Sequence, residues 1–193
     1  MHSIQQEARP GRGEDRLAVQ RLDGCTVIIL ADGAGGQSGG AAAADVLCRS
    51  LATTTDAEAW PRWLSAHDRL PGLAAAVVLS IADDRFIRGA SVGDCEAWYF
   101  SNGRAVELTA QQRRKPLLGE GRAQPVPFSL RATTTGTLVV ASDGLWKYMK
   151  QSRIVTAASL RPLHVAAANL VDGVRLPSGA LQDDVAIVLC EVP

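Results

Sequence analysis

Apolar residues are gathered along the chain in short runs separated by polar and glycine-containing turns. Runs rich in valine, isoleucine and leucine predict β-strands. Two of the turns, Asp23-Gly24 and Asn102-Gly103, are dipeptides typical of β-hairpins. The strands expected from this pattern cover residues 16–22, 25–31, 74–82, 85–93, 95–101, 104–108, 128–134, 136–142 and 184–192.

Other stretches are rich in alanine and leucine, which favour helix. They predict helices over 41–51, 56–67, 145–158 and 161–172, whereas 110–127 is polar and predicts a loop. Strands and helices come in blocks and not in regular alternation. This order is typical of an α+β domain, with mostly antiparallel sheets and helices packed on the sheet faces. The length of the chain predicts a single domain over residues 1–193.

Composition removes several classes of function. The 20 basic and 20 acidic residues give no net charge, which argues against binding nucleic acid through charge. No run of about 18 apolar residues is present to predict a membrane span, and the polar N-terminal stretch lacks the apolar core of a secretory signal. The cysteines have no C-x-x-C spacing. Reduced thiols in a cytoplasmic protein, without nucleic-acid or membrane partners, are therefore expected.

Aspartates stand at the ends of the apolar runs. Asp32 and Asp143 each follow an expected strand, Asp94 lies in a tight turn, and Asp183 and Asp184 precede the last strand. Each of them alone is consistent with a turn or a helix cap. Because burying a lone carboxylate is costly, several at the edge of one core indicate a cation between them. Oxygen ligands without histidine or cysteine favour magnesium or manganese.

Five segments carry these acids in a fixed order: RGEDRLAV, ADGAGGQSGGAAAADVL, GASVGDCEAWYF, LVVASDGLW and QDDVAIVLCEV. Together they resemble the motifs of the PPM-type metal-dependent protein phosphatases, also called protein phosphatase type 2C. The resemblance implies a four-layer αββα sandwich of two antiparallel sheets flanked by helices. It also implies hydrolysis of phosphoserine or phosphothreonine by a water activated by two Mn²⁺ or Mg²⁺ ions.

The resemblance assigns a metal-binding role to four residues. Asp32 would bridge both ions, and the backbone carbonyl of Gly33 would bind the second ion. Asp143 and Asp183 would hold the first ion. Several family members have a third metal site, for which Asp94 is one expected ligand.

Other roles implied by the resemblance concern the first segment. Glu14 and Asp15 would orient metal-bound water. The phosphate-binding arginine of the family lies four residues before this glutamate, where the chain has Pro10. Arg9 or Arg12 could take its place, and register favours Arg9. A planar guanidinium suits this role because it can grip phosphate with two hydrogen bonds.

Two departures from the family bear on function. Lys147 stands where several members have an aspartate of the third metal site, so that site is weaker or replaced by the lysine's own charge. The loop at 110–127 is shorter than the flap of many members. A phosphorylated protein remains the expected partner, either a serine/threonine kinase or its target. The alternatives are a phosphatase-like regulatory or phosphoprotein-binding module with little activity, and a hydrolase of small phosphate esters.

Overall fold

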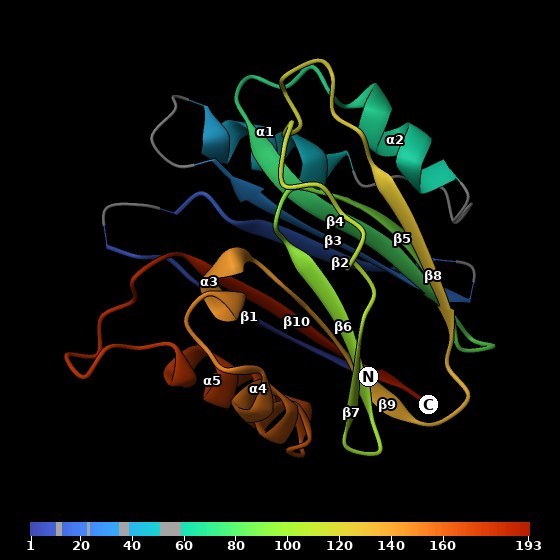
Figure 1. Ribbon diagram of the computed structural model, residues 1–193, viewed down its shortest axis with the longest axis vertical. Coiled ribbons are helices and arrows are strands. Elements are labelled where there is room, and N and C mark those ends of the chain that lie inside the picture. Colours follow the sequence, from blue (N-terminus) through green and yellow to red (C-terminus); the bar gives the residue numbers. More distant parts are fainter. Residues whose placement is uncertain (11–12, 23, 35–38, 51–58) are drawn as a thin grey trace.

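The computed structural model describes residues 1–10, 13–22, 24–34, 39–50 and 59–193. Two five-stranded antiparallel sheets face each other at its centre (Figure 1). The first sheet has the strand order β1 (His2–Glu7), β10 (Val185–Val192), β9 (Gly136–Ala141), β6 (Glu96–Ser101) and β7 (Arg104–Glu107). The second has the order β2 (Arg16–Leu22), β3 (Cys25–Gly33), β4 (Ala74–Ala82), β5 (Phe86–Val92) and β8 (Val126–Arg131).

Helices cover the outer face of each sheet. The second sheet carries α1 (Gly40–Arg49) and α2 (Trp60–Ala66), and the first carries α3 (Asp143–Trp146), α4 (Gln151–Ala158) and α5 (Leu163–Gly173). The predicted four-layer αββα sandwich is thereby confirmed. No helix in the described residues is long and apolar enough to cross a membrane.

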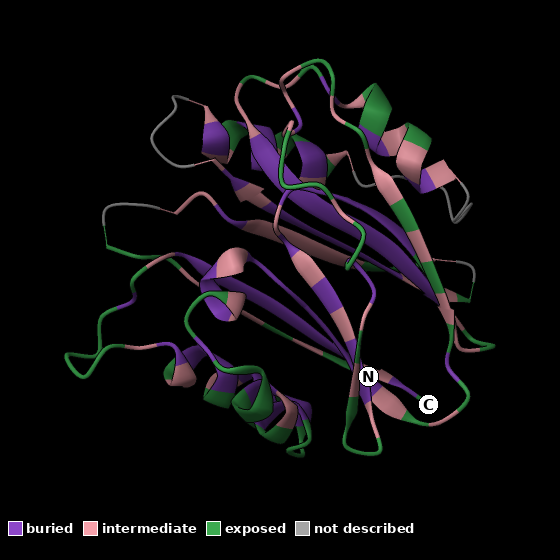
Figure 2. Cartoon of the chain, in the orientation of Figure 1, coloured by how far each residue is buried: buried purple, intermediate pink, exposed green. Residues whose placement is uncertain are grey.

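The uninterrupted apolar runs are explained by burial on both faces of the central strands. In β3, Ile28 and Leu30 face the core between the two sheets. Their neighbours Val27 and Ile29 face the opposite way, into the core beneath α1 and α2. Figure 2 shows this burial as continuous purple along the central strands, with exposed residues at the sheet edges and on the helices. Strands covered on both sides lose the alternation seen in half-buried strands.

Several elements differ from the sequence-based expectation. Strand β1 was not predicted, because it is a polar edge strand paired with β10 alone. Strand β8 begins at 126, inside the predicted loop, and β3 continues through Gly33. The helix predicted over 56–67 is described from Trp60, and its residues 56–58 lie outside the described residues, as does Asp23.

The helix predicted over 145–158 is in fact two helices, α3 and α4, separated at the extended residue Lys150. Met149 and Ile154 face the same core from the two sides of this break. In one continuous helix, a separation of five residues would turn them about 140° apart. The break therefore lets both side chains be buried against the first sheet.

Candidate metal centre

Strand register brings the acidic turns to one end of the sandwich. In the second sheet, Gly33 at the end of β3 pairs with Ala74, and the end of β5 pairs close to the same point of β4. In the first sheet, Ala141 at the end of β9 pairs with Glu96 of β6 and with Ile187 of β10. The aspartates that flank these strand ends consequently meet, and they are Asp32, Asp94, Asp143 and Asp183.

These residues line an open cavity of about 270 Å³. Its acidic side chains are Glu14, Asp32, Asp94, Asp143, Asp183 and Asp184, and Lys147 is the basic residue among its described lining. Carboxylate oxygens of Asp32, Asp94 and Asp143 lie within 4.8 Å of one another. Three carboxylates at this separation are able to share a cation.

The position of Asp32 depends on a close approach between β3 and α1. A Cβ atom on Gly33 would lie 2.4 Å from the carbonyl carbon of Gly40, so only glycine fits there. A Cβ on Gly40 would in turn lie 2.9 Å from Oε1 of Glu14. The Glu14 carboxylate therefore sits beside the first turn of α1, where the helix dipole favours negative charge.

Asp94 is directed into the cavity by the turn between β5 and β6. Gly93 in this turn has φ of 93°, a left-handed conformation that glycine adopts without strain. Its N–H donates a hydrogen bond of 3.0 Å to the carbonyl of Arg113, which joins the turn to the loop at 110–127. Leu117 of this loop forms part of the cavity wall.

The carboxyl groups of Asp15 and Asp32 are buried with too little neighbouring positive charge to favour their ionised forms. Asp15 is 2% exposed, and burial raises its pKa to about 7, although the Ser142 hydroxyl acts in the opposite direction. Its Oδ2 has no hydrogen-bond partner among the described residues. Burial, together with the charge of Asp15, raises the pKa of Asp32 to about 9. Ionising both groups at neutral pH requires added positive charge, so the oxygen-only donor set fits a divalent cation such as Mg²⁺ or Mn²⁺.

One positive charge is supplied by the chain itself. The ammonium group of Lys147 forms an ion pair with Oδ2 of Asp143, one helical turn earlier, and lies 4.0 Å from Oδ2 of Asp183. Burial raises the pKa of Asp143, and the hydrogen bond from Lys147 opposes that rise. The lysine thus neutralises part of the acidic cluster from inside the cavity.

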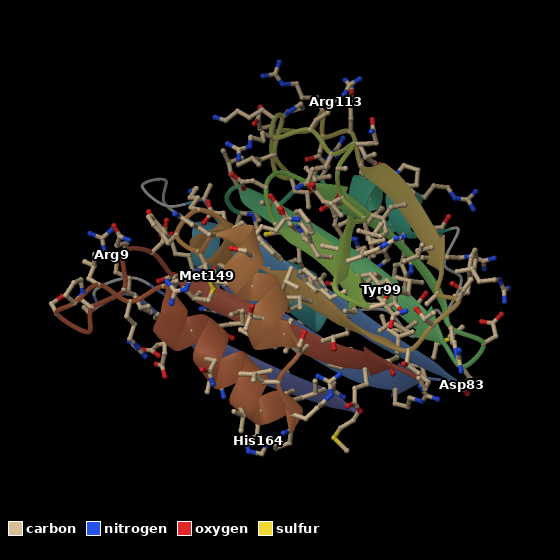
Figure 3. The ribbon with its side chains drawn as sticks, turned by 60° about the horizontal axis from the view of Figure 1, so that its bottom comes forward. Arg9, Asp83, Tyr99, Arg113, Met149 and His164 are labelled. Atoms are coloured by element: carbon tan, nitrogen blue, oxygen red, sulfur yellow. The ribbon has the colours of Figure 1, made fainter. Side chains whose placement is uncertain are left out.

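Most of the predicted site residues lie together in the structure. Glu14, Asp32, Gly33, Asp94, Asp143 and Asp183 surround one cavity, and Asp15 is buried next to Asp32. Arg9 does not line the cavity: its side chain is exposed on the outside of the molecule (Figure 3). Arg12, the other candidate for phosphate binding, lies outside the described residues.

Asp184 has a positioning role that the sequence did not reveal. It is 6% exposed, and its two carboxylate oxygens accept hydrogen bonds from the backbone N–H groups of Arg9 and Glu14, each 2.7 Å long. Buried charge-assisted bonds of this length are among the stronger ones in proteins. Asp184 therefore holds the segment that carries Glu14 against the cavity.

Asp68 plays a similar part for the loop at 110–127. Its oxygens accept hydrogen bonds from the N–H groups of Gly119 (2.8 Å) and Ala123 (2.7 Å). A further bond of 2.9 Å joins the N–H of Leu117 to Glu120 within the loop. These contacts fix the cavity wall that Leu117 forms, and no local sequence signal marks Asp68 for this role.

Comparison with solved structures identifies the architecture. The chain is similar to a mutant form of a bacterial serine phosphatase (TM-score 0.86, 16% identity, 100% of this chain and 98% of the other). It is also similar to the S. agalactiae serine/threonine phosphatase (TM-score 0.81, 18% identity, 98% of each chain). A third similar structure is RsbX in complex with magnesium (TM-score 0.78, 16% identity, 100% of this chain and 94% of the other).

No protein-family model matches the sequence, and no curated protein matches it significantly. The similarity therefore lies in three-dimensional structure, at identities too low to carry over an activity. The chain has the fold of the PPM-type serine/threonine phosphatases, in agreement with the resemblance of its five sequence segments.

Proposed function

We propose that the protein is a metal-dependent serine/threonine phosphatase that hydrolyses phosphoserine and phosphothreonine in proteins. The observation that carries this proposal is the convergence of Asp32, Asp94 and Asp143, whose carboxylate oxygens lie within 4.8 Å of one another. They do so in an acidic cavity of a fold shared with serine/threonine phosphatases. An open cavity at the end of the sandwich suits a phosphorylated side chain presented by another protein.

The donor set supports two Mn²⁺ or Mg²⁺ ions. Asp32 would contact both, Asp143 and Asp183 would hold the first, and the carbonyl of Gly33 would serve the second. When bound, such ions polarise phosphoryl oxygens and ionise water near neutral pH. The presence of magnesium in the RsbX structure is consistent with this choice.

The chain's own residues would position the reactants around that centre. Glu14 lines the cavity and would orient the attacking water, while Asp15, buried next to Asp32, would fix the bridging carboxylate. Arg9 has its backbone anchored by Asp184, which lines the cavity, and its exposed side chain would bind the phosphate. Arg12 is the alternative phosphate ligand.

We further propose a cytoplasmic phosphoprotein as substrate, either a serine/threonine kinase or a kinase target. All four cysteines are free thiols, consistent with a reducing compartment. A second candidate function is favoured by the ion pair of Lys147 with Asp143, which occupies a proposed metal ligand. That candidate is a phosphatase-like regulatory or phosphoprotein-binding module with little activity.

Phosphate release from a phosphothreonine peptide tests the proposal. The protein is assayed with Mn²⁺, with Mn²⁺ plus excess chelator, and as the Asp32→Asn variant. Asp83→Asn is the matched control, because Asp83 is an exposed aspartate paired with Arg21. We expect release that requires Mn²⁺, is lost in Asp32→Asn and persists in Asp83→Asn.

Two other outcomes would redirect the assignment. Tight phosphopeptide binding without release, from folded protein with any divalent ion, would support the binding module. Faster turnover of a small phosphate ester than of the phosphopeptide, at matched concentrations, would instead support a hydrolase of small esters.

A further inference from the structure

We propose that Lys147 is a resident cation of the acidic cavity: its ammonium group lies against Asp143 and Asp183 and offsets part of the negative charge that attracts divalent ions. The lysine stabilises the metal-free site and weakens metal binding beside it. This inference rests on the proposed function only in assuming that the cavity binds divalent ions.

The backbone of α3 directs Lys147 at the cluster. Asp143 is the first residue of this helix and Lys147 caps its C-terminal end, so their side chains share one face. The N–H of Lys147 donates a hydrogen bond of 2.9 Å to the carbonyl of Asp143, which fixes their spacing. The ion pair with Asp143 and the 4.0 Å approach to Asp183 follow from that geometry.

Packing on the other sides of α3 sets the direction in which the side chain of Lys147 leaves the helix. Leu145 is fully buried and Met149 is 7% exposed in the core beneath the helix. Trp146 stacks on Trp98 with ring centroids 5.6 Å apart, and its Nε1 donates to the carbonyl of Ala141 (3.0 Å). These contacts hold the helix in one rotation about its axis, and Lys147 faces the cavity in that rotation.

The acidic residues around Lys147 explain why its charge affects both stability and metal binding. The cavity has six acidic side chains in its lining, and without the lysine they would face one another with no described basic partner in that lining. A divalent ion about 4 Å from the ammonium group is repelled strongly enough to lower its affinity at least about tenfold, even with the screening of bulk water.

Calorimetric titration of Mn²⁺ into chelator-treated protein measures the effect of Lys147 on metal binding, and thermal unfolding of the metal-free protein measures its effect on stability. We expect Lys147→Met, or Lys147→Gln if the first variant does not fold, to bind Mn²⁺ about tenfold more tightly. The same change should lower the metal-free Tm by about 2–4 °C. Lys147→Arg keeps the charge and should resemble the wild type in both measurements. Lys150→Met removes an exposed lysine nearby and is the matched control.

A fourth variant tests whether a metal ligand at position 147 adds an ion to the cavity. Lys147→Asp adds a carboxylate beside Asp94 and Asp143, and we expect it to bind one more Mn²⁺ per chain than the wild type. Unchanged affinity in Lys147→Met, an unchanged ion count in Lys147→Asp, or no Mn²⁺ binding by any variant would each overturn the inference. None of these measurements uses turnover. Protein that shows the expected metal effects but releases no phosphate would refute the phosphatase and leave the role of Lys147 standing.

Discussion

Replacing Asp15 by asparagine should flatten the pH dependence of stability in the metal-free protein. In the folded chain the pKa of Asp15 is raised from 3.8 to about 7, chiefly by burial. The folded state therefore binds more protons than the unfolded state between these values, and the free energy of unfolding falls as pH rises. The stabilising proton is fully present below about pH 4 and is lost as pH passes through 7.

The size of the effect follows from the same values. At about 1.4 kcal/mol for each pKa unit, a rise from 3.8 to about 7 corresponds to about 4 kcal/mol. That is a large part of the 5–15 kcal/mol typical of a folded domain. Asp32, with its pKa raised to about 9, extends the same trend to higher pH, and removing the charge of Asp15 relieves part of that rise.

Urea denaturation at pH 5 and pH 8, in chelator and in Mn²⁺, checks this prediction. In chelator we expect Asp15→Asn to exceed the wild type by up to about 4 kcal/mol at pH 8 and by no more than about 2 kcal/mol at pH 5. Mn²⁺ should raise the stability of the wild type at pH 8 by binding the folded state. Equal pH dependence of the two proteins in chelator would contradict the raised pKa of Asp15 in the folded chain, and Asp83→Asn controls for the loss of an exposed charge.

Three further predictions concern two positioning contacts and the proposed phosphate ligand. Asp184→Ala removes the acceptor of two backbone N–H groups and should cost about 2–4 kcal/mol of stability in urea denaturation; a loss below about 1 kcal/mol would contradict the anchoring role. Asp68→Ala should speed amide hydrogen exchange at Gly119 and Ala123 while leaving exchange in α5 unchanged. Exchange rates at these two amides equal to those of the wild type would contradict the anchoring of the loop by Asp68. Arg9→Ala should raise KM for a phosphopeptide with little change in kcat, whereas an effect confined to Arg12→Ala would transfer phosphate binding to that residue.

Much of the fold was readable from the sequence because its central strands are buried on both faces. Strands β3, β4 and β10 form apolar runs that are interrupted by few polar residues. Strand β1 escaped prediction because only its partner β10 explains why the polar stretch HSIQQE is extended. It is stabilised by pairing with a strand at the other end of the sequence, and a local pattern of residues does not reveal that pairing.

The sequence predicted those residues of the site that stand at the ends of strands. Asp32, Asp94, Asp143 and Asp183 were found in this way, and the structure places all four around one cavity. The pairing of Lys147 with Asp143 was missed, because the helix was predicted to begin at 145. With α3 starting at Asp143, the two residues are one turn apart.

Contacts to distant backbone groups were beyond the reach of the sequence. Asp184 binds amides about 170 positions away, and Asp68 binds amides more than 50 positions away. The partners cannot be recognised from their side chains, because the donors are main-chain N–H groups, which nearly every residue has. Such anchors become visible only when the tertiary structure is known.

The proposed function requires the acidic cavity to be a two-metal centre built on Asp32. Crystals grown with Mn²⁺ and measured near the manganese absorption edge test it most directly. We expect two anomalous peaks in the cavity that share Asp32, one beside Asp143 and Asp183 and the other beside the carbonyl of Gly33. A cavity without a peak at saturating Mn²⁺, or peaks that do not touch Asp32, would contradict this expectation.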